Sequence, residues 1–186
     1  MTSRGAAVYT PTAKALHWTI ALLVGIQFVT ALAMPDIGPH TRPDTWISLH
    51  FSIGVLILAV MAARLVHRLI YPVPLEASQA PAWERVLALL IHRLFYLILL
   101  VGPVLGWASA SAHRLTVSLF GLITLPSIAA AKARWALTAG DVHATAMWVL
   151  LALVGLHAAA VLYHHIVRRD GTLRRMLPKD LRRAQA

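Results

Sequence analysis

Two histidines stand at the ends of an apolar stretch, HATAMWVLLALVGLH, which covers residues 143–157. An imidazole is unfavourable in apolar surroundings unless a partner or ligand holds it. In an α-helix, a spacing of fourteen residues is about 40° short of four whole turns, so both side chains lie on nearly the same side, about 21 Å apart along the axis. In a hydrocarbon core about 30 Å thick, this spacing predicts two sites, one near each membrane face.

Each of these imidazoles needs a partner at its own depth. His50 lies about 6 Å into another apolar segment, which matches His143 near the outer face. His17 and His92 both lie in the inner halves of their segments, and either is able to face His157. Imidazole pairs at two levels of a helix bundle are typical of two haem b groups with two axial histidines each.

The residue inventory supports a non-covalent haem. The chain has 10 His and no Cys, which excludes thiolate zinc sites, iron–sulfur clusters and covalent haem attachment. Gly54 follows His50 by one helical turn, where a missing side chain leaves room for a flat ring. The alternative is that each histidine only packs or bridges helices, and four at matched depths favour ligation.

The composition is that of a membrane protein. Of 186 residues, 59% are hydrophobic and 13% are charged, and the mean hydropathy is +0.69. A water-soluble domain carries about a quarter charged residues. The net charge of +10 is spread between and beyond apolar segments, which argues against a nucleic-acid partner and favours a topology signal.

Four segments reach the roughly 20 apolar residues that a spanning helix needs. We therefore predict an all-α, integral membrane four-helix bundle, a single membrane domain over 1–186, with spans at about 15–34, 46–66, 86–109 and 140–166. Ala-Leu-Ala at 31–33 could instead follow a signal peptide, but the apolar run exceeds a signal core, so we expect a retained anchor. The connection 110–139 is long, and its stretch LTVSLFGLITLPSI is expected along the outer interface.

The basic residues predict the orientation. With the N-terminus inside, the outer segments hold only Arg42, Arg114, Lys132 and Arg134 among the 17 Lys and Arg residues. The inner segments hold all the others, including Arg4, Lys179, Arg182 and Arg183 in the terminal segments. The positive-inside rule then places both termini in the cytoplasm. The basic tail would attract anionic lipid, and His67, His164 and His165 are expected as interfacial anchors, with proton or quinone contacts as the alternative for the last two.

The sequence resembles the bacterial cytochrome b561 family along nearly its whole length. The matching stretches are LHWTIALLV, SLHFSIGVLILAVMAARLVHRLIYP, VHATAMWVLLALVGLHAAAVLYHH and RRMLPK. The resemblance implies that His17 and His157 ligate an inner haem b and that His50 and His143 ligate an outer one. The stretch IHRLFY is also similar, which implies that His92 lines a quinone or propionate site. A multi-pass protein of the bacterial inner membrane is implied as well.

Cationic side chains are candidates to bind the haem propionates, because Arg matches a carboxylate in a bidentate way. We expect Arg42 and Arg134 in this role at the outer haem, and Lys14, Arg64 and Arg93 at the inner one. The outer cations could also steer a small anion, or they could simply solvate the loop or bind lipid phosphates.

Three functions are consistent with these residues. Some proteins that this chain resembles oxidise superoxide at the outer face and reduce ubiquinone, and we expect that oxidoreductase activity here. The second candidate is a cytochrome b anchor that passes electrons between quinone and a separate dehydrogenase or hydrogenase as its redox partner. The third is a transporter that uses histidines without haem.

Overall fold

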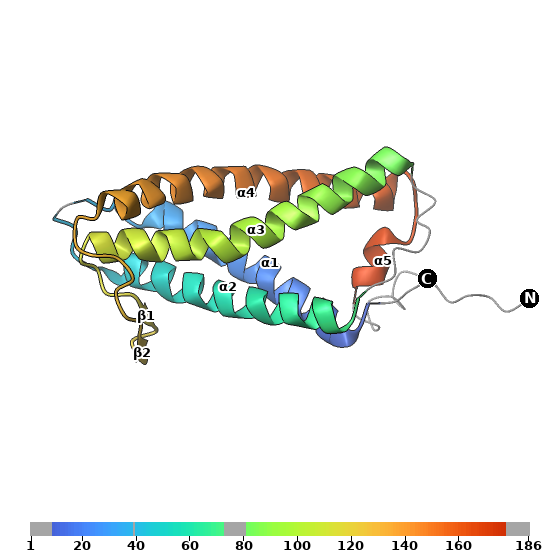
Figure 1. The fold of residues 1–186 in the computed structure, drawn as a ribbon. Helices are drawn as coiled ribbons and strands as arrows, with labels where there is room; N and C mark the ends of the chain where they lie inside the picture. The colour runs from blue at the N-terminus through green and yellow to red at the C-terminus, as the bar shows by residue number, and fades with distance from the viewer. Residues whose placement is uncertain (1–8, 39, 73–80, 178–186) are drawn as a thin grey trace, which may run out of the picture.

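The computed structural model describes residues 9–38, 40–72 and 81–177. Within them, four long helices run side by side (Figure 1): α1 (Pro11–Ala33), α2 (Thr45–Ile70), α3 (Ala82–Ala112) and α4 (Arg134–Ile166). All four are long and apolar enough to cross a membrane. The predicted all-α four-helix membrane bundle is therefore confirmed. Arg4, Lys179, Arg182 and Arg183 lie outside the described residues.

Each helix extends beyond its predicted span on at least one side. α1 begins at Pro11 because the side chain of Thr10 accepts a hydrogen bond from the Ala13 amide, and α2 begins after Asp44, which caps the Ile47 amide at 2.8 Å. α4, expected from 140, begins at Arg134. Hydropathy marks only the part of a helix within the hydrocarbon, whereas backbone hydrogen bonding continues into the polar headgroup region.

We call the end that holds the short helix α5 (Thr172–Met176) the inner end, after the orientation expected from the charges. α5 is joined to α1 by two hydrogen bonds. The indole of Trp18 donates to the Met176 carbonyl at 2.9 Å, and Lys14 Nζ donates to the Leu177 carbonyl at 3.1 Å. The segment after α4 therefore returns to the start of α1 and covers part of the inner end.

The opposite, outer end carries a small hairpin between α3 and α4. Strands β1 (Ser118–Leu119) and β2 (Ile123–Thr124) pair antiparallel, with Ser118 opposite Thr124. The hydroxyl of Ser52 on α2 lies 2.9 Å from the Ser118 carbonyl and accepts a hydrogen bond from the Phe120 amide. This buried serine holds the loop against the bundle.

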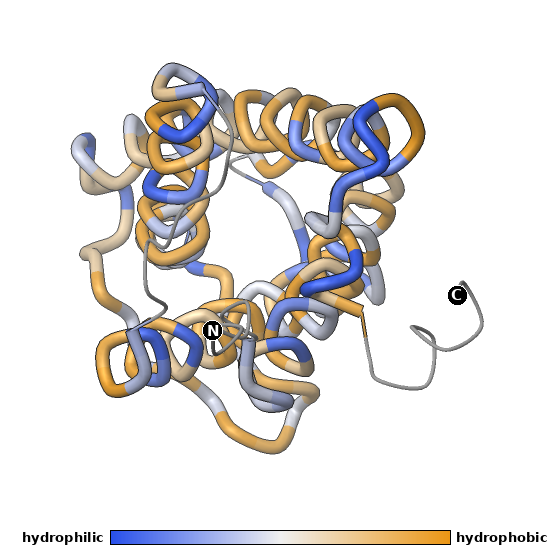
Figure 2. Tube along the Cα trace, turned by 90° about the vertical axis from the view of Figure 1, so that its right-hand side faces the viewer, coloured by the Kyte–Doolittle hydropathy of each residue, from blue (hydrophilic) through white to orange (hydrophobic). Residues whose placement is uncertain are grey.

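The helices pack as α1 against α2, α2 against α3, and α3 against α4. Figure 2, which looks along the bundle from the inner end, shows these largely hydrophobic helices arranged around a common axis. A core of buried side chains from all four helices lies between the two ends: Ile20, Val24, Ile53, Ile57, Met61, Ile98, Leu99 and Leu150. Many large apolar side chains on the sides of the bundle are exposed, as expected for helices that face lipid.

Small residues let α3 and α4 approach closely near the outer end. Ala108 and Ala112 of α3 pack against Ala136 and Ala139 of α4. A Cβ atom added to Gly140 would overlap the hydroxyl oxygen of Ser109 and lie 3.1 Å from its Cβ. Glycine at 140 is therefore required by the packing, in the way that small residues generally serve helix contacts in membranes.

Replacing Gly140 by Ala is expected to lower the free energy of unfolding by about 1–3 kcal/mol, because the added methyl group forces α3 and α4 apart. Thermal unfolding of the purified protein in detergent measures this effect. Gly155→Ala on the same helix is the matched control, since a Cβ there meets nothing within 4 Å. Equal melting temperatures for the two variants would contradict the packing argument.

Candidate functional site

The outer level of the bundle brings together one imidazole from α2 and one from α4, with their ring planes nearly perpendicular. The ring centres of His50 and His143 are 6.3 Å apart. Two imidazoles bonded to one metal ion from opposite sides, each at about 2 Å, have ring centres about 6 Å apart. The spacing therefore suits a metal held between two axial nitrogens, and it is too long for a direct hydrogen bond.

The side chain of His143 is oriented by α3. Its Nδ1 donates to the Gly102 carbonyl at 2.8 Å, which leaves Nε2 available for a ligand. A Cβ added to Gly106 would lie 3.2 Å from this ring, so glycine at that position lets the imidazole lie against the α3 backbone. Metal-bound histidines commonly donate their second ring nitrogen to a carbonyl in this way, which sets both tautomer and orientation.

The side chain of His50 is contacted by Gln27 of α1. The Gln27 amide nitrogen donates to the His50 carbonyl at 3.0 Å and lies 3.3 Å from His50 Nε2. His50 Nδ1 and Gln27 Oε1 are buried without a hydrogen-bond partner among the described residues. A buried imidazole with an unsatisfied nitrogen is costly in an apolar interior, which is the behaviour expected of a residue built to bind something else.

A cavity of about 550 Å³ surrounds the outer pair. Its walls are largely apolar, and His50, His143, Gly54 and Gly106 lie in its lining. The outer part of the lining carries three ionisable side chains that sequence reasoning did not single out: Asp36, His113 and Asp141. Two imidazoles, apolar walls and glycines where a flat ring would pass are the features that a non-covalent haem b requires.

The inner level also holds a pair of imidazoles from two helices, and a third histidine lies close to one of them. The ring centres of His17 on α1 and His157 on α4 are 6.5 Å apart. His92 on α3 also approaches His157, with ring centres 5.6 Å apart, and its Nδ1 donates to the Ala88 carbonyl at 2.6 Å. Phe95 packs edge-on against His157 from the same helix. The structure therefore brings together both inner candidates, His17 and His92, that the spacing had left open.

The cations expected at the propionates lie in varied surroundings. Arg42 and Arg134 are exposed and do not belong to the lining of the outer cavity. At the inner end, Lys14 is buried against the carbonyl of Leu177, and Arg64 Nη1 donates to the Ala13 carbonyl at 3.2 Å. Arg93 is exposed. Their proposed contacts with propionates stay predictions.

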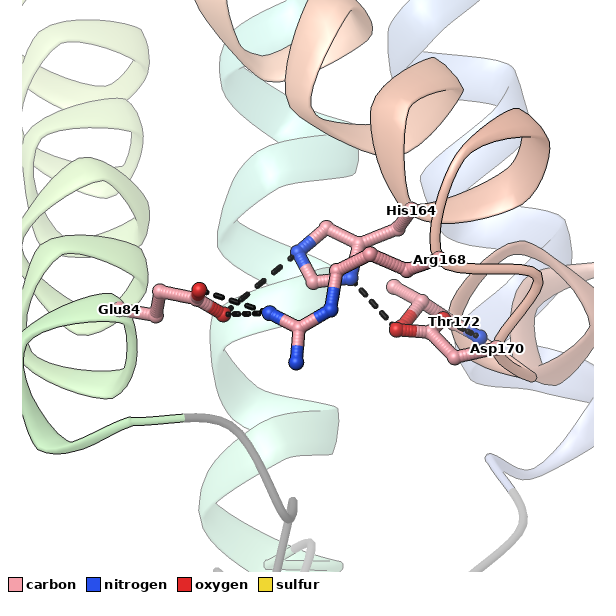
Figure 3. A network of polar contacts seen from close by, with 5 residues as sticks. All are labelled: Glu84, His164, Arg168, Asp170 and Thr172. Carbon is pink, nitrogen blue, oxygen red and sulfur yellow. Dashed lines mark hydrogen bonds and ion pairs between the residues drawn. The ribbon is translucent and has the colours of Figure 1, made fainter.

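Two of the histidines expected as interfacial anchors have specific partners. His67 Nε2 lies 3.2 Å from the Thr10 hydroxyl at the start of α1. His164 belongs to a polar network that joins α3, α4 and the turn before α5, in which Glu84, Arg168, Asp170 and Thr172 also take part (Figure 3). The seven-residue spacing between His157 and His164 is a signal in the sequence that could have placed His164 on the same helix face.

Nearly the whole chain is similar in sequence to known proteins. The family described as prokaryotic cytochrome b561 matches residues 8–179. The chain is 32% identical over 164 residues to the probable superoxide oxidase CybB of Yersinia pestis, covering 88% of this chain and 92% of that protein. It is 30% identical over 170 residues to cytochrome b561 homolog 2 of Escherichia coli (strain K12), covering 89% of each. Cytochrome b561 homolog 1 of the same strain is 29% identical over 167 residues, which cover 88% of this chain and 93% of that protein.

Proposed function

Because the chain belongs to the prokaryotic cytochrome b561 family, a family of haem b electron-transfer proteins, we propose that it holds two haem b groups, one at each His pair. The resemblance predicted from the sequence is thus confirmed, and the chain is a bacterial membrane protein of electron transfer. The observation that carries the proposal is the recurrence of one geometry, ring centres 6.3 Å and 6.5 Å apart, at two levels of the bundle.

Haem b supplies reversible one-electron chemistry at its iron. His50 and His143 would hold one haem b and His17 and His157 the other, and with two imidazoles holding each iron the donor and acceptor would exchange electrons without binding to it. The protein would then tune each haem through the residues around its histidine pair. The Gly102 carbonyl orients His143 and raises the basicity of its other ring nitrogen toward a metal. The apolar walls of the cavity exclude water.

We propose superoxide as the electron donor at the outer face and ubiquinone as the acceptor, with the protein in the bacterial inner membrane and both termini in the cytoplasm. Two superoxide ions would each lose one electron to become O₂. The quinone would take up those two electrons and two protons to become quinol. The name of the Yersinia relative supports this donor, as do the exposed cations Arg114 and Lys132 of the outer connection and Arg134 at the start of α4.

The two axial pairs make separable predictions. Replacing His50 by Ala is expected to remove the outer haem and to leave the inner one, so that the haem content falls from about two to about one per chain. A pyridine haemochrome assay with reduced-minus-oxidised spectra measures this loss. The exposed outer histidine His40 provides the control, since His40→Ala should keep both haems. Equal loss of both haems from a folded His50→Ala protein would refute the pairing.

The glycine against His143 makes a second prediction. A leucine at Gly106 would occupy the space of the imidazole, and we expect at least a tenfold weaker retention of the outer haem with the inner haem unchanged. Haem loss to a scavenging apoprotein, followed by absorbance, measures this retention. Gly155→Leu is the control on an open surface of α4. Similar haem loss from both variants would show that bulk alone, and not contact with His143, is responsible.

Rapid mixing tests the proposed donor and acceptor. Superoxide is expected to reduce the oxidised protein quickly, and added ubiquinone should then restore the oxidised spectrum and sustain turnover. Stopped-flow absorbance measures both steps. Slow reduction that quinone does not accelerate would instead favour an anchor subunit that receives electrons from a separate dehydrogenase or hydrogenase.

A further inference from the structure

A cluster of ionisable side chains joins three elements at the inner end (Figure 3). The His164 imidazole of α4 lies between two carboxylates: its Nδ1 is 2.5 Å from Asp170 Oδ2, and its Nε2 is 3.9 Å from Glu84 Oε2 on α3. Arg168 donates to both oxygens of Glu84, at 2.7 Å and 2.9 Å. His164 and Glu84 are largely shielded from solvent, with side chains 21% and 18% exposed.

The charges of this cluster depend on one proton. Partial burial acts to raise the pKa of Asp170, but hydrogen bonds from Thr172 and His164 outweigh it and lower that pKa to about 2. Asp170 therefore stays ionised at neutral pH, and Arg168 compensates the charge of Glu84. The cluster is neutral when His164 carries a proton and has one net negative charge when it does not. His164 is thus the group whose protonation sets the net charge of this cluster.

Other charged groups also lie near this end. α3 and α5 make the main contacts with α4, and α1 meets it at the level of His17 and His157. Beyond Glu84, the first turns of α3 carry the exposed Arg85, and α5 carries the exposed Arg174 and Arg175. On α1, Lys14 donates to the Leu177 carbonyl after α5. On α4 itself, the titratable neighbours of His164 are Tyr163, with ring centres 6.0 Å apart, and His165, while Arg168 follows the end of the helix.

The cluster lies closer to the inner end of α4 than the inner His pair does. His164 follows His157 by seven residues, which places both on the same face of α4 within about 20° and about 10 Å apart along the axis. A unit charge at that distance, with an effective dielectric constant of about 20, shifts a proton equilibrium by about one unit of pH. An electron at the His17–His157 level would therefore favour the protonated form of His164, and protonated His164 would favour the electron.

We propose that His164, held between Glu84 and Asp170, is a proton-binding site that takes up a proton from the inner aqueous phase when an electron reaches the His17–His157 level. The proton returns to the water when the electron passes on to the acceptor, so that charge balances at each step. This inference rests on the proposed inner haem, and it adds the coupling of that haem to the protons of the cytoplasmic side.

The test is the pH dependence of the inner-haem potential in the full-length protein. Potentials are measured by spectroelectrochemical titration between about pH 5 and pH 8, where histidines titrate. The His50→Ala spectrum identifies the inner signal. In the unmodified protein the inner potential should fall as pH rises, because the positive charge on His164 is lost. Reduction in weakly buffered solution should also consume protons, as a pH-indicator dye would show.

His164→Gln should make the inner potential nearly independent of pH and should abolish the proton uptake. The adjacent His165→Gln is the matched control and should retain both. Asp170→Asn keeps the test decisive if His164→Gln does not fold, because loss of one carboxylate should move the pH-dependent region to lower pH. A flat inner potential in a two-haem protein, or an unchanged slope in His164→Gln, would overturn this inference alone. A protein with one haem and no inner signal would overturn the two-haem proposal as well.

Discussion

The structure depends on one constraint, which is that imidazoles placed in hydrocarbon must have partners. α4 carries His143 and His157 on one face, and each meets a histidine of another helix at ring-centre distances of 6.3 Å and 6.5 Å. The partners come from α2 and α1, so three of the four helices are tied to one register. Sliding any one of them by a turn would leave an imidazole alone in an apolar environment. The four-helix arrangement is therefore specified by a few polar groups as well as by apolar packing.

The two levels share a spacing but differ in their surroundings. At the outer level, the α3 backbone orients His143 through the Gly102 carbonyl, and a cavity with mostly apolar walls surrounds the pair. At the inner level, His92 and Phe95 pack against His157, and the charged cluster around His164 lies two helical turns further along α4. Because burial, hydrogen bonds and nearby charge all tune a haem potential, these differences would give the two levels different electron affinities. A difference of that kind is what directs electrons across a membrane.

The charges at the two ends suit different tasks. The cations of the outer connection are exposed, whereas the lining of the outer cavity includes the carboxylates Asp36 and Asp141 with His113. Exposed cations are suited to attract an anion to this end of the molecule. At the inner end, oppositely charged groups are paired with each other around His164, so that one proton changes their net charge. The exposed cations and the paired charges around His164 thus lie at opposite ends of the bundle.

The sequence by itself determined the four apolar helices, because spanning length and composition are local properties. Helical spacing converts directly into depth, so it also indicated His50, His143 and His157, but it left His17 and His92 both open as the inner partner, and the resemblance alone favoured His17. The sequence also indicated the family through the stretches around those histidines. Only the tertiary structure decided that His92 joins His157, that Asp36 and Asp141 rather than Arg42 line the outer cavity, and that His164 lies between two carboxylates. Those contacts depend on helix rotation and on the course of connecting segments. Neither quantity follows from hydrophobic periodicity in helices that are apolar on nearly every side.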